Sequence, residues 1–248
     1  MSLKITDHPS PNFGPRAAGK KISFLILHYT AVPGDEALRI LTTPASEASA
    51  HYFIDEDGSV LRLVPEDKRA WHAGKSFWAG ETDVNSCSIG IEIQNLGHEN
   101  GLPEFPAVQM KAAAELCRGI IERHKILPQH VLAHSDIAPA RKRDPGERFP
   151  WKALAAQGIG LWPDVTAADK TGTVFDIKSL LTKYGYDPAA DARLAITAFQ
   201  RHFVPEVFEM PNKAGTADLD SVYILNALLR LSVPLRKQGS SVGSPADE

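Results

Sequence analysis

Alternating and continuous runs of apolar residues predict a β-sheet in the first half of the chain. Residues 22–27 (ISFLIL) form an unbroken apolar run with β-branched and aromatic side chains, which is typical of a strand buried on both faces. Residues 88–94 (SIGIEIQ) alternate instead, so that the isoleucines face one way and Glu92 faces the other. The segments AHYFI and SVLRLV flank an Asp-Gly pair at 57–58, which indicates a hairpin. HVLAH (130–134) predicts a further short strand.

A helical period appears between these strands. From about residue 106 to residue 124, apolar positions recur at the spacing of an amphipathic helix that packs on the sheet. They are Val108, Ala112, Leu116, Ile120 and Ile121. Strands interleaved with helices favour the α/β class over a helical bundle or a β-sandwich.

The pattern changes after residue 160. Residues 161–175 mix proline, glycine and polar residues, which is typical of a linker or a domain boundary. Three short helical patterns follow, at 176–185, 191–203 and 218–231. Asp176 is a candidate N-cap and Gly185 a C-terminal glycine of the first pattern. We therefore expect a small all-α domain of three helices, followed by a disordered tail at 236–248 that has almost no apolar residues.

Composition narrows the class of protein. The chain has 248 residues, of which 43% are hydrophobic and 23% charged, which is ordinary for a globular protein. A net charge of −3 gives no broad attraction for nucleic acid or an anionic membrane. Cys87 and Cys117 are too few for a disulfide framework or a cysteine-held metal. No apolar run is long enough to span a membrane, and the first ten residues lack the apolar stretch of a signal peptide.

Histidines at the ends of two predicted strands suggest a metal site. His28 follows the most apolar strand and His134 ends the strand at 130–134. A single histidine in such a place is more often a hydrogen-bonded core residue, and residues 134–145 could form a charged surface turn. Asp144, ten residues after His134 on a proline-flanked loop, supplies a third ligand. Catalytic zinc typically takes three protein ligands and keeps one position open, so the trio favours a metal site.

Two further polar residues fit catalysis at such a site. If the RKRD segment is extended, Lys142 lies on the same side as Asp144, where it can donate to an oxyanion, while Arg141 and Arg143 face solvent. Glu92 lies in a half-buried strand, where a carboxylate is costly unless it is paired or functional. Burial would raise its pKa toward that of a general base, although a structural salt bridge stays equally open.

The blocks that carry these residues resemble a known family. FLILHYT, SAHYFI, RAWHAG, SIGIEI and HSDIAPARKRDPG, in this order, are similar to the zinc-dependent N-acetylmuramoyl-L-alanine amidases of the AmpD/AmiD type, whose domain is shared with peptidoglycan recognition proteins. The resemblance spans about residues 20–160. It implies that His28, His134 and Asp144 bind one Zn²⁺ per chain, and that Glu92 and Lys142 are the catalytic pair. It also implies a central mixed β-sheet flanked by helices, the type 2 amidase fold, over residues 1–165.

The resemblance extends to substrate-binding and C-terminal residues. It implies that Trp71 and His72 belong to the substrate groove, together with Tyr29, which matches the longer envelope-associated members. His51 is similarly placed, although a buried, hydrogen-bonded role fits it equally well. Residues 173–235, with AFQRHF, resemble the three-helix peptidoglycan-binding domain of longer members.

Together these features predict an enzyme that cleaves the amide bond between N-acetylmuramic acid and L-alanine in peptidoglycan or muropeptides. A non-catalytic peptidoglycan-binding protein is the alternative, but such proteins usually lack a zinc ligand, and every ligand position is filled here. A zinc peptidase is disfavoured because the chain has no HExxH motif. We expect the cell envelope rather than the cytoplasm, with no nucleic-acid partner and no membrane span. The sequence does not indicate an oligomeric state.

Overall fold

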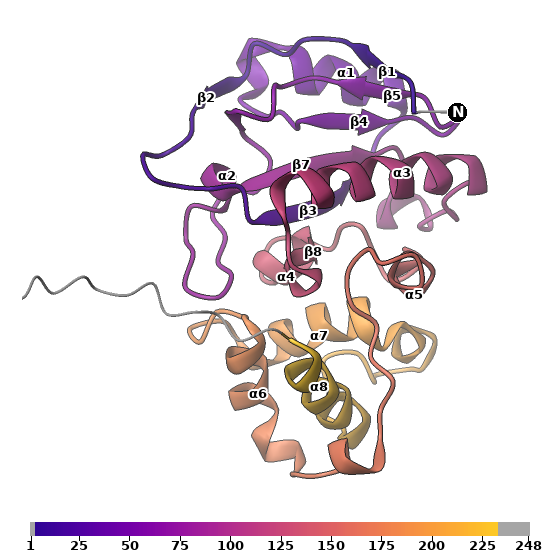
Figure 1. Cartoon of the computed structure of the whole chain (residues 1–248). Coiled ribbons are helices and arrows are strands. Elements are labelled where there is room, and N and C mark those ends of the chain that lie inside the picture. The colour runs from indigo at the N-terminus through magenta and orange to yellow at the C-terminus, as the bar shows by residue number, and fades with distance from the viewer. Residues whose placement is uncertain (1–2, 233–248) are drawn as a thin grey trace, which may run out of the picture.

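The computed structural model describes residues 3–232, and its core is a mixed six-stranded sheet (Figure 1). The strands are β1 (Ile5–Asp7), β2 (Phe13–Pro15), β3 (Phe24–Tyr29), β4 (Tyr52–Ile54), β5 (Val60–Arg62), β6 (Lys68–Ala70), β7 (Ser88–Ile93) and β8 (Val131–Ala133). The helices are α1 (Gly34–Thr42), α2 (Val84–Cys87), α3 (Ala107–His124), α4 (His134–Ile137), α5 (Trp151–Ala155), α6 (Ile177–Tyr184), α7 (Ala192–Phe203) and α8 (Leu219–Leu231).

The sheet has the order β1-β5-β4-β7-β3-β8, and β2 and β6 form a separate antiparallel pair. β3 lies parallel to both β7 and β8, whereas β4 and β5 form the antiparallel hairpin predicted around the Asp-Gly pair. The predicted α/β class and the mixed sheet flanked by helices are confirmed. The strand predicted at 22–27 begins and ends two residues later, so that His28 lies inside β3 and not after it.

Helix α3 occupies the predicted range, but Val108 does not lie on its buried face. Leu116 and Ile120 are buried against the sheet, whereas Val108 is 53% exposed. Positions four apart drift by about 40° around a helix of 3.6 residues per turn. Over the three steps from Ile120 back to Val108, this drift carries the side chain out of the contact.

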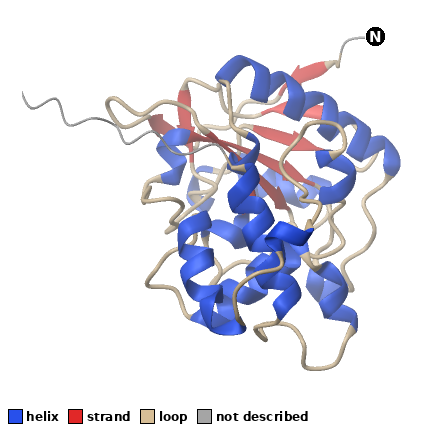
Figure 2. Ribbon diagram, turned by 60° about the horizontal axis from the view of Figure 1, so that its bottom comes forward, coloured by secondary structure: helices blue, strands red, loops and turns tan. Residues whose placement is uncertain are grey.

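Two hydrophobic cores lie on opposite faces of the sheet. On one face, Leu25 and Leu27 of β3 share a core with Leu116 of α3. On the other face, Ile26 belongs to a core that includes Phe199 of the C-terminal helices. In Figure 1, α6, α7 and α8 lie below β8 and α4, and Figure 2 shows helices in front of the sheet when this lower part comes forward. The C-terminal helices and the sheet therefore share one core.

The segment at 161–175, which the sequence predicts as a linker, packs on α8. The Asn226 side-chain amide donates to the backbone carbonyls of Asp169 and Thr171, at 3.0 Å each. Arg230 forms an ion pair with Asp169 at 2.8 Å. These contacts fix the segment along α8, although α6 is the helix that follows it in the chain.

The three predicted C-terminal helices are present, with one difference in capping. Asp176 does not cap α6, because its carboxylate accepts from the backbone N–H of Thr173 and closes the preceding turn. Gly185, with φ of +146°, ends α6 as predicted. The predicted disordered tail at 236–248 lies outside the described residues.

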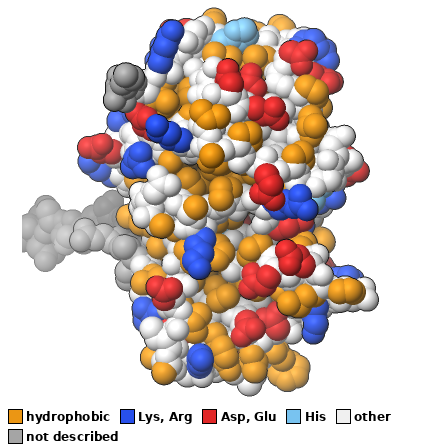
Figure 3. Space-filling model, turned by 90° about the vertical axis from the view of Figure 1, so that its right-hand side faces the viewer, with side chains coloured by type: hydrophobic (Ala, Val, Ile, Leu, Met, Phe, Trp, Pro, Cys, Tyr) orange, Lys and Arg blue, Asp and Glu red, His pale blue; other side chains and the backbone are white. Residues whose placement is uncertain are grey.

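Charged side chains of both signs lie on the described surface. Figure 3 shows acidic and basic side chains intermixed over one face, with no large field of a single sign. Among residues 3–232, no helix combines the length and apolar character needed to cross a membrane.

The shared core predicts that the C-terminal helices are needed for stability. A chain that ends at Asp164 would expose the face of the sheet that carries Ile26 and Leu132, so we expect it to lose cooperative thermal unfolding or to aggregate. Circular dichroism on heating measures this, with a chain that ends at residue 235 as the control. If the chain that ends at Asp164 unfolds cooperatively at the same temperature as the full-length chain, the C-terminal helices are not needed for stability.

Candidate metal-dependent active site

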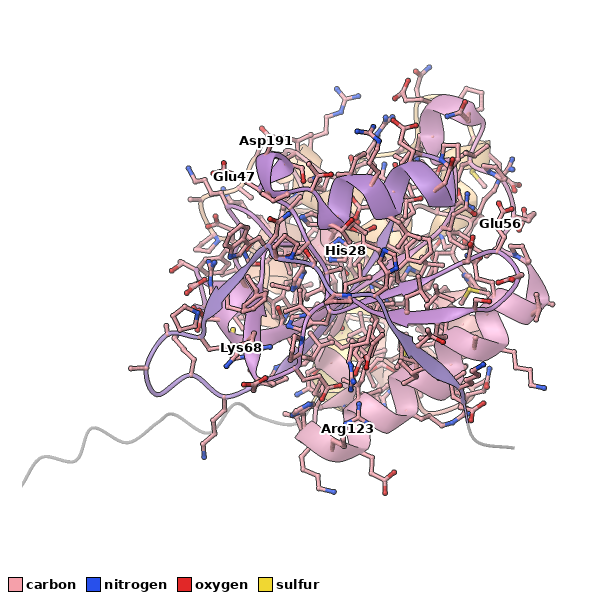
Figure 4. All side chains as sticks on the ribbon, turned by 90° about the horizontal axis from the view of Figure 1, so that it is seen from above. His28, Glu47, Glu56, Lys68, Arg123 and Asp191 are labelled. Atoms are coloured by element: carbon pink, nitrogen blue, oxygen red, sulfur yellow. The ribbon has the colours of Figure 1, made fainter. Side chains whose placement is uncertain are left out.

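Three candidate metal ligands meet at the carboxyl ends of two neighbouring strands. His28 lies near the end of β3, and His134 directly follows β8, its parallel neighbour. The loop after α4 brings Asp144 back to them. The two Nδ1 atoms lie 2.9 Å apart, and the Oδ2 atom of Asp144 lies 3.0 Å from each of them. All three residues are buried. In Figure 4, His28 lies near the middle of the molecule, well inside the labelled surface residues Glu47 and Lys68.

A chain of hydrogen bonds fixes the tautomer of His28. The Ser88 hydroxyl donates to the Val84 carbonyl at 2.7 Å, so its oxygen must accept from Nε2–H of His72 at 3.1 Å. Nδ1 of His72 is then an acceptor, and it receives the Nε2–H of His28 at 3.0 Å. Nδ1 of His28 therefore carries no proton when this imidazole is neutral. Burial, and then the neighbouring His134, lower its pKa to about 4, which keeps the ring neutral at pH 7.

The tautomer of His134 is fixed in the same way. Its Nε2 lies 3.2 Å from the Ala73 carbonyl, which can only accept, so Nε2 carries the proton and Nδ1 is bare. Two imidazole lone pairs and one carboxylate oxygen thus face one another without a proton between them. A cation at their centre would satisfy all three. An ion at about 2.0–2.1 Å from tetrahedral ligands holds those ligands about 3.3 Å apart, close to the spacing found here.

Glu92 lies beside this triad, and the described residues offer it no ion-pair partner. In the parallel pairing of β3 and β7, Glu92 stands opposite His28, so both side chains emerge on the same face. Its Oε2 atom is buried without a hydrogen bond, and no ion pair joins it to another residue that the structure describes. Burial, and then the nearby Asp144 charge, raise its pKa well above the ordinary value. The structural salt bridge that the sequence left open is therefore not formed within the described chain.

Gly90 lets the polar groups pack this closely. A Cβ atom at this position would lie 2.4 Å from Cγ of His72, far inside van der Waals contact. Any other residue would displace His72 and, with it, the proton that fixes His28.

His134 and Asp144 of the triad line a cavity of about 220 Å³. It is lined by Tyr29, Thr30, Ala31, Leu41, Ala48, Ser49, Trp71, His72, Glu92, His134, Lys142 and Asp144. Lys142 and Asp144 face it together, whereas Arg141 donates to the Ala73 carbonyl and Arg143 pairs with Glu99. The cavity therefore joins the candidate ligands to a free carboxylate and an ammonium group.

The four predicted substrate-binding residues differ in their position relative to the cavity. Tyr29, Trp71 and His72 line the cavity, although the ring of His72 mainly orients His28. His51 does not line it. Its side chain is fully buried, its Nδ1 accepts from the Gly90 N–H at 3.0 Å, and its Nε2 lies 3.1 Å from the Lys68 carbonyl. His51 therefore has the buried, hydrogen-bonded position that the sequence left open, and it gives substrate no access.

Several residues that complete the site carry no sequence signal. Ser88 fixes a tautomer from within a strand, and His98 accepts from the Tyr29 hydroxyl at 2.8 Å across 69 residues of chain. The tertiary fold alone brings these groups to the cavity.

Comparisons with known sequences agree with this geometry. A sequence profile described as "N-acetylmuramoyl-L-alanine amidase" matches residues 18–147. The chain is 40% identical over 240 residues to "N-acetylmuramoyl-L-alanine amidase AmiD" of Escherichia coli (strain K12), which covers 86% of this chain and 84% of AmiD. It is 32% identical over 166 residues to "1,6-anhydro-N-acetylmuramyl-L-alanine amidase AmpD" of Enterobacter cloacae, which covers 60% of this chain and 87% of that protein.

Solved structures extend the similarity to the whole fold. The E. coli AmiD structure in complex with the substrate anhydro-N-acetylmuramic acid-L-Ala-D-gamma-Glu-L-Lys matches with a TM-score of 0.75 and 38% identity, covering 87% of this chain and 91% of that chain. AmpDh3 from Pseudomonas aeruginosa also has a TM-score of 0.75, with 36% identity, covering 86% of this chain and 93% of its own. The profile match over the catalytic fold and these relatives together show that the chain belongs to the N-acetylmuramoyl-L-alanine amidase family.

Proposed function

We propose that the chain uses one zinc ion, held by His28, His134 and Asp144, to hydrolyse the amide bond between N-acetylmuramic acid and L-alanine. The observation that carries this proposal is the convergence of three proton-free ligand atoms beside the unpaired carboxylate of Glu92. Two imidazoles and one carboxylate suit zinc and leave one of its four positions open. The substrate named for the AmiD complex contains this bond, which supports the same substrate class here.

In this mechanism the chain's own groups move the proton and hold the charge. Bound zinc would polarise the scissile carbonyl and lower the pKa of water toward about 7. Glu92 takes the proton from the attacking water, which its raised pKa favours, and returns it to the departing amine of L-alanine. Lys142, on the same cavity wall as Asp144, donates to the oxyanion of the tetrahedral intermediate.

Side chains of the cavity wall orient the substrate and support the metal ligand. Trp71 offers an apolar, stacking surface, and Tyr29 offers a hydroxyl whose proton is already donated to His98. His72 holds the His28 ring. We assign Tyr29 and Trp71 to substrate contact and His72 to the support of the metal ligand. Tyr29 and the C-terminal helices also match the envelope-associated members that the sequence resembles, and we propose that location for this chain.

The C-terminal helices offer a second site for the same polymer. A cavity of about 460 Å³ lies between α7 and the loop before α8, lined by Arg193, Val207, Phe208, Glu209, Met210, Pro211, Asn212 and Ala214. We propose that this cavity binds the cell wall, as the resemblance to peptidoglycan-binding domains implies. A second contact on one polymer raises the effective concentration of the first, by about 10²–10⁴-fold in avidity.

The metal assignment predicts the behaviour of two histidine variants. Protein purified without chelator should carry about one zinc per chain, and His134→Ala should lose most of it, since two ligands remain. His130→Ala removes a neighbouring buried histidine outside the triad and should keep the metal. Elemental analysis of both variants measures this. Full zinc occupancy in His134→Ala would disprove the assignment.

The general-base role predicts loss of turnover without loss of metal. Glu92→Gln keeps the shape of the side chain, so zinc content and fold should persist while kcat for a soluble muropeptide falls about 10²–10⁴-fold. Lys142→Met should also lower kcat, by about 10²-fold, through loss of an oxyanion donor. The exposed Glu122→Gln is the control. Wild-type kcat in Glu92→Gln would show that another group is the base.

The wall-binding proposal predicts a split between two surface variants. On the Glu92→Gln background, which does not digest the wall, Met210→Glu places a charge in the C-terminal cavity, so less protein should sediment with purified sacculi. Val108→Glu makes the same change at an equally exposed apolar residue on α3. Sedimentation assays should show weaker binding only for Met210→Glu. Equal binding by both variants would count against the cavity.

A further inference from the structure

Two consecutive residues of α7 contact the metal-ligand loop, residues 134–147, one near each end of the loop. His202 Nδ1 donates to Asp136 Oδ2 at 2.7 Å, two residues after His134. Arg201 Nε donates to Glu147 Oε2 at 3.1 Å, three residues after Asp144. The loop that carries two of the three metal ligands is thus held at both ends by one helix.

Asp136 is fully buried, and its carboxylate accepts three hydrogen bonds. Besides His202, its carboxylate accepts from the Ala133 N–H at 2.8 Å and from the Tyr186 hydroxyl at 2.6 Å. The Ala133 bond closes the first turn of α4, in which His134 is the first residue. The His202 ring stacks on Trp151, with centroids 3.8 Å apart, so it cannot turn away from the carboxylate. The Asp136 network therefore fixes the backbone that carries His134.

The contact at Glu147 continues into the cavity. Glu147 also accepts from His98 Nε2–H at 2.9 Å, and the other nitrogen of His98 accepts from Tyr29. Arg201 is itself only 7% exposed and lies over the ring of Phe208, 4.9 Å from its centroid. These charged and polar contacts therefore link the core of the C-terminal helices to the far end of the loop.

We propose that α7 is part of the catalytic centre's support, with Arg201 and His202 as positioning residues that fix the metal-ligand loop. The inference rests on the proposed zinc site. The loop has one short helix of its own and one internal bond between its ligand-bearing ends, from the Ser135 N–H to the Asp144 carbonyl at 3.0 Å, so contacts from outside add to the support of its ligands. Outer partners of this kind typically change metal affinity or activity by about 10–100-fold.

Paired variants separate positioning from stability. His202→Phe keeps an aromatic ring for stacking but removes the donor to Asp136. His202→Asn is smaller and loses the stacking, but its Nδ2 can stand where the histidine Nδ1 stood. We expect zinc affinity, measured by competition with a chelator, to fall about tenfold in His202→Phe and to stay near wild type in His202→Asn. Thermal stability should fall more in His202→Asn, so the two variants should rank oppositely in the two measurements.

Arg201 allows the same test at the other end of the loop. Arg201→Gln can place an amide nitrogen at the position of Nε, whereas Arg201→Leu cannot donate to Glu147. Zinc affinity should therefore fall in Arg201→Leu and recover in Arg201→Gln. Two controls act elsewhere in the C-terminal helices. Arg230→Met breaks the ion pair with Asp169, and Leu225→Ala opens a cavity in the core, and neither should change zinc affinity.

The outcomes distinguish this inference from the proposed function. If the wild-type chain binds no zinc, the metal site itself is wrong. If the wild type binds zinc and His202→Phe and Arg201→Leu bind it equally well, the site stands and the support by α7 is refuted. A loss of zinc affinity in Leu225→Ala as large as in His202→Phe would also refute it, because general stability would then explain the effect.

Discussion

The Nδ1 atoms of His28 and His134 and one oxygen of Asp144 lie within 3.0 Å of one another, although their tautomers leave no proton between them. Three acceptors repel one another at this distance, so the surrounding chain must hold them in place until a cation does. The Ser88–His72 chain holds the first histidine, and the Ala73 carbonyl holds the second. The aspartate's own backbone carbonyl accepts from the Ser135 N–H at 3.0 Å, which closes the loop on itself. The chemistry of the site depends on this enforced closeness.

The sheet fixes this geometry through the register of its strands and the alternation of side chains between its two faces. His28 and Glu92 stand opposite each other in parallel strands, so one ligand and the candidate base share a face without any loop to adjust them. Two residues before His28, on the same face of β3, Ile26 is buried in an apolar core. Strand β3 therefore changes from core to active site within two residues. This explains why a continuous apolar run ends on a histidine.

The sequence predicts those features that follow from local pattern. Alternation in β7 placed Glu92 on the polar face, and the family blocks placed the three ligands. Pattern could not separate His51, which directly precedes β4, from His72, which follows β6: both are buried, yet only His72 reaches the cavity. Sequence pattern also could not predict the hydrogen bonds made by Ser88 and His98, since these bonds join segments far apart in the chain.

The C-terminal helices both cover one face of the sheet and contact the metal-ligand loop. Here the second face of the sheet is apolar and carries Ile26 and Leu132, which makes a covering layer necessary. Because that layer lies directly under β8 and α4, its polar residues reach the loop that carries His134. A helix that covers the core at this position cannot be removed without also releasing the metal-ligand loop.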